Sequence, residues 1–264
     1  MKPLSELPID AVDTVFTDID DTLTTEGKLT AQAYAALEDL QAAGLRVIPV
    51  TGRPAGWCDH IARMWPVDGV IGENGAFYLW HDGDSGKLRT RHLYDDSTRA
   101  ANATRLAGVR ERILREVPGA GIASDQFCRL YDLAIDFCED VPPLDDAAIN
   151  RIVALMEEAG MTAKVSSIHV NGWFGEYDKL SMARIMMNER YRTDLNDPAQ
   201  RARCVFAGDS PNDAPMFDYF PLSVGVANVR DFAERLPHPP SFVTQAGHGA
   251  GFAELARHLL RNRE

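Results

Sequence analysis

The sequence has no long apolar run, few cysteines and a deficit of positive charge. None of its 264 residues lies in a run approaching the roughly 18 apolar residues of a membrane span, and MKPLSELPID lacks the apolar core of a secretory signal. Lys and Arg number 27 against 39 Asp and Glu, so the net charge of −12 argues against a nucleic-acid partner. The four cysteines form no CxxC pair, which favours reduced thiols and a cytoplasmic location.

Short apolar runs alternate with helical patterns at both ends of the chain. We expect strands at residues 11–17, 45–50, 69–71, 204–207, 222–226 and 241–244. We expect helices at residues 30–43, 54–64 and 179–190, one from residue 211 and one at the C-terminus. Strands that alternate with helices predict an α/β fold with a Rossmann-like parallel sheet and helices on both faces.

The middle of the chain has a different pattern. Two alternating segments, 76–81 and 88–94, flank DGDSGK, which is typical of a hairpin turn. Helices are expected at 98–116 and 145–159, and strands at 129–137 and 161–170. This pattern predicts an α+β cap at residues 83–175, inserted into a discontinuous α/β core made of residues 1–82 and 176–264.

The segment VFTDIDDTLT, residues 15–24, places carboxylates where the first strand ends. Asp18 and Asp20 are two residues apart and point the same way from a strand. Ligands of open α/β sheets bind beyond the carboxyl ends of the strands, and Mg²⁺ is a hard cation that would offset the repulsion. A calcium loop of the EF-hand type is excluded, because Leu23 stands where Gly is needed and Leu29 where Glu is needed. A solvated acidic strand end stays open as the alternative.

A second carboxylate segment, VFAGDSPNDAPMF at residues 205–217, repeats this design. Asp209 and Asp213 follow an apolar strand, and Ser210-Pro211 suits the start of a helix. Alone, GDSPND could be only a capped turn. Parallel strands in one sheet would bring Asp209 beside Asp18, so a shared metal site accounts better for both segments.

A phosphate would need donors and positive charge near these carboxylates. Thr51, Gly52 and Arg53 follow the strand at 45–50, and the helix beginning at Pro54 adds its N-terminal dipole. Lys179 opens the helix at which the core resumes and could neutralise charge there, although a lone lysine is more often a surface residue.

These stretches resemble, in order, the four motifs of the haloacid dehalogenase superfamily of phosphohydrolases. DIDDT is similar to the first motif, VTGRP to the second, Lys179 to the third and GDSPND to the fourth. The insertion after IGENGA resembles the cap of the Cof-like branch, which includes phosphatases of sucrose phosphate and mannosylphosphoglycerate. One departure is that Leu180 follows the lysine, where Gly is common in this branch; Lys164 is the other lysine close upstream.

The resemblance implies a role for each matching residue. Asp18 would be the nucleophile and Asp20 the acid and base, while Lys179 and Thr51 would hold the phosphate. Mg²⁺ would be bound by Asp18, the backbone carbonyl of Asp20 and Asp209, with Asp213 as a further ligand or a partner of the ligands. Asn212 would contact the phosphate or orient Lys179. Gly52, Arg53 and Asn74 are expected to face the same site, because they lie near strand ends.

The cap is expected to recognise the leaving group. Its polar and aromatic candidates are Arg89, Arg91, His92, Arg129, His169, Asn171 and Trp173. Trp173 and Phe174 also suit a packing role at the hinge between cap and core, and this interpretation is favoured. The Gly-rich segment SFVTQAGHGAGF is not a dinucleotide fingerprint, since Phe252 stands where Gly is needed, and its His248 is expected to be structural.

The sequence thus predicts a Mg²⁺-dependent phosphatase for a small phosphorylated metabolite, with a sugar phosphate as one candidate. A phosphomutase of the same superfamily is the alternative enzyme. A non-catalytic binding or regulatory module is the alternative outside enzymes, but such a module would be expected to lose Asp18 or Asp20, and both are present. The physiological substrate and the oligomeric state stay open.

Overall fold

The computed structural model describes residues 1–166 and 168–261, and the chain divides into two compact units. The core unit comprises Met1–Gly52, Cys58–Arg91 and Asp178–Glu264, the last three residues of which lie outside the described part. The inserted unit comprises Arg53–Trp57 and His92–Tyr177. None of the described helices has both the length and the apolar character needed to cross a membrane.

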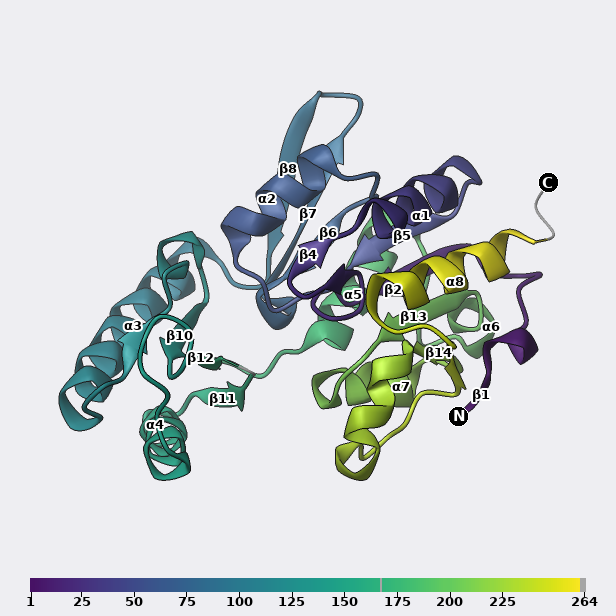
Figure 1. Cartoon of the computed structure of the whole chain (residues 1–264). Helices are drawn as coiled ribbons and strands as arrows, with labels where there is room; N and C mark the ends of the chain where they lie inside the picture. Colours follow the sequence, from purple (N-terminus) through teal and green to yellow (C-terminus); the bar gives the residue numbers. More distant parts are fainter. Residues whose placement is uncertain (167, 262–264) are drawn as a thin grey trace. The chain divides into compact units, whose positions relative to one another are not determined.

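A parallel sheet of six strands forms the centre of the core unit, which confirms the predicted fold class (Figure 1). Every pairing along this sheet is parallel. Its strands, in spatial order, are β1 (Lys2–Pro3), β15 (Phe242–Val243), β14 (Leu222–Gly225), β13 (Cys204–Gly208), β2 (Thr14–Thr17) and β5 (Arg46–Pro49). β1 adds an edge strand that the sequence did not predict.

The two strands at the middle of this sheet set the position of the carboxylate segments. All residues of β2 and of β13 are buried, so both faces of the sheet are covered there. Thr17 pairs with Ala207, the backbone N–H of Asp18 donates to the carbonyl of Ala207, and Gly208 ends β13. The segments DIDDT and GDSPND therefore begin side by side at one edge, as the sequence predicted.

Helices cover the parallel sheet in pairs. α1 packs against α8 and α5 packs against α7, and the first pair lies side by side in Figure 1. α1 begins after Thr30, whose side chain accepts a hydrogen bond from the backbone N–H of Ala33, and the chain turns at Gly44, where φ is +80°. The helices are α1 (Ala31–Ala42), α2 (Ala55–Met64), α5 (Lys179–Tyr191), α6 (Pro198–Arg201), α7 (Ala214–Tyr219) and α8 (His248–Leu260).

Two smaller sheets complete the core unit. β3 (Thr24–Thr25) and β4 (Lys28–Leu29) form a short hairpin after β2. β6 (Val70–Gly72), β7 (Phe77–Asp82) and β8 (Lys87–His92) form a separate sheet in which β6 and β7 are antiparallel. Its link to the parallel sheet is a bridge between Val50 and Ile71. The contacts group residues up to Arg91 with the core unit, whereas the sequence predicted the boundary at residue 82.

The inserted unit has an antiparallel sheet with two helices. The strands, in spatial order, are β11 (Thr162–Val165), β12 (His169–Trp173), β10 (Asp132–Asp136) and β9 (Gly121–Ile122). The helices are α3 (Asp96–Glu116) and α4 (Asp146–Glu158). The single strand predicted at 161–170 is in fact two strands, which turn between Val165 and His169; residue 167 of that prediction lies outside the described residues. No Gly or Pro marks this turn, so the sequence pattern did not reveal it.

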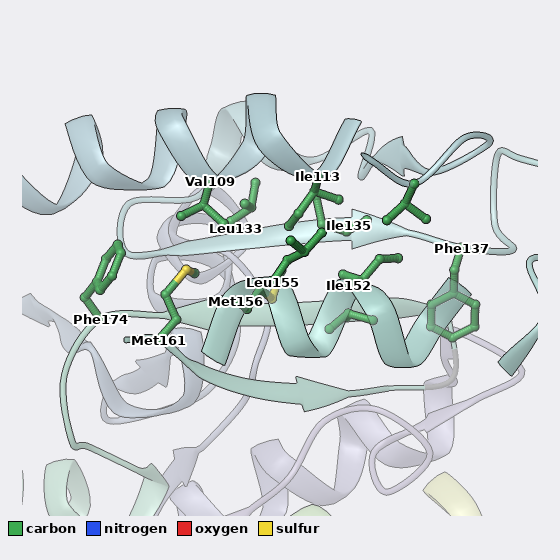
Figure 2. Close-up of a cluster of buried hydrophobic side chains, with 12 residues drawn as sticks. Val109, Ile113, Leu133, Ile135, Phe137, Ile152, Leu155, Met156, Met161 and Phe174 are labelled. Carbon is green, nitrogen blue, oxygen red and sulfur yellow. The ribbon is translucent and has the colours of Figure 1, made fainter. Parts of the chain in front are cut away.

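One face of this antiparallel sheet packs on α3 and α4 (Figure 2). Leu133 and Ile135 of β10 point into this apolar cluster, and the residues that alternate with them do not belong to it. The buried members of the cluster are Val109, Ile113, Val117, Leu133, Ile135, Phe137, Ile152, Leu155, Met156, Met161, Val170 and Phe174. The inserted unit thus has a hydrophobic core of its own, which is what an independent domain requires.

Candidate active site

Asp18 is held at the carboxyl end of β2 by the backbone of the neighbouring strand. Its backbone N–H donates to the carbonyl of Ala207, 2.9 Å away, and its own carbonyl accepts the hydroxyl of Thr17 at 2.8 Å. The side chain is 4% exposed. A buried carboxylate at this edge needs a partner of positive charge.

Asp209 and Asp213 bring two more carboxylates to the same place. Oxygen atoms of Asp18, Asp209 and Asp213, one from each residue, all lie within 4.8 Å of one another. Asp213 ends the short 3₁₀ helix Pro211–Asp213, which directs its side chain toward Asp209. Oδ2 of Asp213 accepts the backbone N–H of Asp209 at 3.1 Å. Gly208 is required here, because a Cβ at that position would overlap the carboxylate of Asp213.

Lys179 supplies a cation in the middle of this cluster. Its Nζ donates to Asp18 Oδ1 at 2.6 Å and to Asp213 Oδ1 at 2.8 Å, and the side chain is buried. Lys179 is the first residue of α5, and its place is fixed by a capping box in which Asp178 and Ser181 bond each other's backbone N–H groups. The structure thus brings Lys179 to Asp18, whereas the other lysine considered, Lys164, lies on β11 of the inserted unit.

The pKa values of these groups show that one lysine does not balance the carboxylates. Burial raises the pKa of Asp18 well above its usual range, against the opposing effect of Lys179, and Asp213 and Asp209 raise it further. Burial, followed by the carboxylates of Asp213 and Asp21, raises the pKa of Asp209 to about 7. Burial alone would lower the pKa of Lys179, but Asp18 and Asp213 outweigh it and raise that pKa. The site therefore favours an additional positive charge.

The donors of this cluster suit a hard divalent cation. Three buried carboxylates offer oxygen ligands within 4.8 Å, and Mg²⁺ is bound in proteins by a few carboxylates together with phosphate or water oxygens. Asp20 is half-buried, and its carboxylate does not belong to the group of three. This placement is compatible with the prediction that Asp20 uses its backbone carbonyl toward the metal and keeps its carboxylate for proton transfer.

Thr51 and Gly52 reach the same edge from the next strand. The backbone N–H of Val50 donates to the carbonyl of Thr17 at 2.8 Å, which places Thr51 next to Asp18 along the sheet edge. Thr51 is fully buried, and its carbonyl accepts the backbone N–H of Asn74 at 3.0 Å. The Asn74 side chain lies over Gly52, 3.1 Å from where a Cβ would be. The loop that follows β5 at Thr51 and Gly52 therefore packs against Asn74, next to Asp18.

Two other predicted residues have different surroundings. Arg53 is grouped with the inserted unit, where its guanidinium stacks on the ring of Trp57 at 4.5 Å. Asn212 is exposed, and its side-chain carbonyl accepts the hydroxyl of Ser210 at 2.9 Å. The second hydrogen bond of Lys179 goes to Asp213, and the role of Asn212 toward the phosphate or Lys179 stays a prediction.

The candidates for recognition of the leaving group are divided between the units. Arg89 and Arg91 belong to the core unit and pair there with Asp82 and Glu189. In the inserted unit, buried Arg129 pairs with Asp125 and Asp132, and Asn171 donates to Asp132 at 3.0 Å. Trp173 and Phe174 are buried, and Phe174 belongs to the apolar core of that unit. Their predicted packing role at the hinge between cap and core stays a prediction.

Two residues of the site were missed in the sequence. The hydroxyl of Thr22 donates to Asp209 Oδ1 at 3.2 Å, and the amide of Asn228 donates to Asp209 Oδ2 at 3.3 Å. Thr22 lies inside the first carboxylate segment, so its proximity could have been expected. Asn228 lies outside all four motifs, and no local pattern in the sequence identifies it.

Gly75 supports the start of α5 and therefore the position of Lys179. Its φ is +106°, and a Cβ would overlap the carbonyl oxygen of Asp178, the residue that caps α5. We expect Gly75→Ala to lower the free energy of unfolding by about 2–4 kcal/mol, because it adds both backbone strain and a clash. Urea unfolding measures this change.

Gly83→Ala is the matched control for that variant. Gly83 has no atom within 4 Å of its Cβ position and does not have a positive φ, so the control should change the free energy of unfolding by less than about 1 kcal/mol. Equal effects of the two substitutions would contradict the packing role of Gly75.

Comparison with known proteins supports the assignment made from the motifs. Residues 15–99 match the model of the haloacid dehalogenase-like hydrolase family. This part of the chain is similar to a haloacid dehalogenase-like hydrolase. The matched segment contains the first two motifs, with Asp18 and Thr51, and the predicted resemblance is confirmed.

Solved structures share the fold of this chain over nearly its whole length. A protein from Thermoplasma acidophilum is 18% identical with a TM-score of 0.71, covering 94% of this chain and 98% of that one. A HAD/COF-like hydrolase from Plasmodium vivax is 17% identical with a TM-score of 0.67, covering 95% and 96%. The sucrose-phosphatase of Synechocystis sp. PCC6803, solved with sucrose and phosphate, is 15% identical with a TM-score of 0.64, covering 94% and 98%. No curated protein matches the sequence significantly.

Proposed function

We propose that this protein is a Mg²⁺-dependent phosphatase that acts on a small phosphorylated metabolite, with sugar phosphates as the first candidates. The observation that carries the proposal is the buried cluster of Asp18, Asp209 and Asp213 around the ammonium of Lys179. The family match supports an enzyme of the hydrolase class. The structural similarity to a sucrose-phosphatase supports a phosphorylated sugar as substrate.

Asp18 would act as the nucleophile. Its Oδ1 accepts the hydrogen bond from Lys179, so Oδ2 is the oxygen that would attack phosphorus. As the Oδ2–P bond forms, the bond between phosphorus and the leaving oxygen breaks, and Asp20 gives its proton to that oxygen. The product of this step is an alcohol and an aspartyl phosphate, which divides a difficult displacement into two easier ones.

Water would complete the reaction. Asp20, now a carboxylate, takes a proton from a water molecule whose oxygen attacks phosphorus, and the bond between phosphorus and Asp18 breaks to release inorganic phosphate. The half-buried position of Asp20, two residues after the nucleophile, suits a group that exchanges protons with both the leaving group and water. Thr51 and the backbone around Gly52 would hold phosphate oxygens during both steps.

The remaining residues would provide charge balance. Mg²⁺, held by Asp18, Asp209 and Asp213, would neutralise the carboxylates and the phosphate when bound. The ammonium of Lys179 donates directly to Asp18 and opposes burial, which raises the pKa of this carboxyl. Asp213 fixes both Lys179 and the backbone of Asp209.

A panel of phosphate monoesters tests the proposal. We expect release of inorganic phosphate from at least one sugar, polyol or nucleotide phosphate in the presence of Mg²⁺. Release should stop with EDTA and return when excess Mg²⁺ is added. A panel that gives no phosphate release with Mg²⁺ would overturn the proposed function, and an isomeric sugar phosphate as the product would show phosphoryl transfer in its place.

A further inference from the structure

Both carboxylate oxygens of Asp209 are held by side chains from other loops. Thr22 Oγ1 donates to Oδ1 at 3.2 Å, and Asn228 Nδ2 donates to Oδ2 at 3.3 Å. Asp209 is 4% exposed, so these donors face it in a largely dry environment. Hydrogen bonds to a metal-ligating carboxylate fix its orientation, and their removal typically weakens metal binding.

Asn228 also connects three loops at the carboxyl edge of the sheet. It follows β14, at the start of the 3₁₀ helix Ala227–Arg235. Besides Asp209, its Nδ2 reaches the backbone carbonyl of Asp21 at 3.0 Å, and its Oδ1 accepts the backbone N–H of His248 at 2.8 Å. One amide thus joins the loop after β2, the loop after β13 and the turn before α8.

The backbone around Asn228 is shaped to bring these loops together. Asp21 has a φ of +56° and His248 a φ of +54°, conformations that cost a residue other than glycine of the order of 1 kcal/mol or more. A Cβ on Gly247 would lie only 3.1 Å from Asn228 Oδ1. Two strained residues and a close glycine surround a side chain that lies outside every motif of the site.

We infer that Asn228, together with Thr22, is a positioning residue that orients the Asp209 carboxylate for the divalent cation. This inference rests on the proposed function, because the cation is the Mg²⁺ of that proposal. The Asn228 side chain is not itself suited to bind the cation, because its Nδ2 is a donor and its Oδ1 already accepts the backbone N–H of His248. Its contribution is to hold Oδ2 in place while Thr22 holds Oδ1.

Calorimetric titration of the metal-free protein with Mg²⁺ tests this inference without substrate. We expect Asn228→Ala and Thr22→Val to weaken Mg²⁺ binding by about tenfold or more. Thr22→Ser keeps the hydroxyl and should bind Mg²⁺ within about threefold of the wild-type protein. Asn102→Ala is the matched control, because Asn102 lies on α3 of the inserted unit and accepts a hydrogen bond from Arg105.

The Mg²⁺ dependence of phosphatase activity distinguishes a positioning role of Asn228 from a general loss of structure. Phosphatase activity of Asn228→Ala should require more Mg²⁺ and should recover to within about threefold when Mg²⁺ saturates, with the KM for the phosphate ester unchanged. Thr22→Val tests the same carboxylate without touching the turn before α8, so it keeps the inference testable if Asn228→Ala folds poorly.

Each other outcome has a definite meaning. If both variants bind Mg²⁺ as tightly as the wild-type protein and lose only thermal stability, Asn228 and Thr22 are structural ties and the inference is wrong. If the wild-type protein itself does not bind Mg²⁺, the metal in the proposed function fails and the inference falls with it. If the wild-type protein binds Mg²⁺ and the Thr22→Ser variant is as weak as Thr22→Val, the hydroxyl is not the group that matters.

Discussion

Asp18→Asn is expected to abolish phosphate release while raising the free energy of unfolding of the metal-free protein. Activity should fall by at least about 10³-fold, since an amide cannot form the aspartyl phosphate. Stability should rise because burial, with added repulsion from Asp213 and Asp209, raises the pKa of Asp18 and so disfavours its charged form in the folded state. A neutral amide removes that cost and still offers an oxygen to Lys179.

Phosphate release and urea unfolding in EDTA check the two parts of this prediction. Asp10→Asn is the control, since Asp10 is an exposed residue before β2 and should leave both quantities nearly unchanged. Activity of Asp18→Asn within tenfold of the wild-type enzyme would show that Asp18 is not the nucleophile. A loss of stability would show that the ion pair with Lys179 outweighs the burial of the carboxylate.

Lys179→Met is expected to have the opposite effect on stability. It leaves Asp18 and Asp213 buried beside Asp209 without the ammonium that bonds two of them. Breaking a buried pair by removing one partner costs about 3–5 kcal/mol, so the metal-free variant should be less stable by this amount. Phosphate release should fall by about 10²-fold or more, because a charge that stabilises the transferring phosphoryl group is lost.

Mg²⁺ provides the diagnostic measurement for this variant. Thermal unfolding with and without Mg²⁺ should show a larger stabilisation in Lys179→Met than in the wild-type protein, because the added cation meets carboxylates that have lost the ammonium of Lys179. Lys28→Met, at an exposed position on β4, is the control. A variant as stable as the wild-type protein in EDTA would contradict the ion-pair network.

The sequence identified the carboxylate site because its residues follow strand ends. Asp18 comes after β2 and Asp209 after β13, and a local pattern is enough to recognise each strand. The two strands are parallel neighbours, so their carboxyl ends lie at the same edge of the sheet and the segments meet there. This proximity follows from the parallel sheet that the sequence predicted. The same reasoning placed Thr51 beside Asp18.

Other features depend on contacts that leave no periodic pattern. Asn228 reaches Asp209 from a loop after β14, and Asn74 reaches Gly52 through a backbone conformation with φ of +56°. A single amide in a loop has many possible partners, so its partner could not be chosen from the sequence. The boundary of the inserted unit is hard to predict for a related reason: alternation predicts the strand β8, but it does not say which unit that strand joins.

The inserted unit enters and leaves through aromatic residues that touch. The rings of Tyr94, two residues after the entry point, and Tyr177, at the exit, have centroids 6.3 Å apart, and Tyr131 contacts both. Chain ends this close are the condition for exchanging or excising a domain without stretching its host. Residues 92–177, which make up the inserted unit apart from Arg53–Trp57, could therefore be exchanged through two nearby junctions for the corresponding segment of a protein with the same fold, while Asp18, Thr51, Lys179 and Asp209 all belong to the core unit.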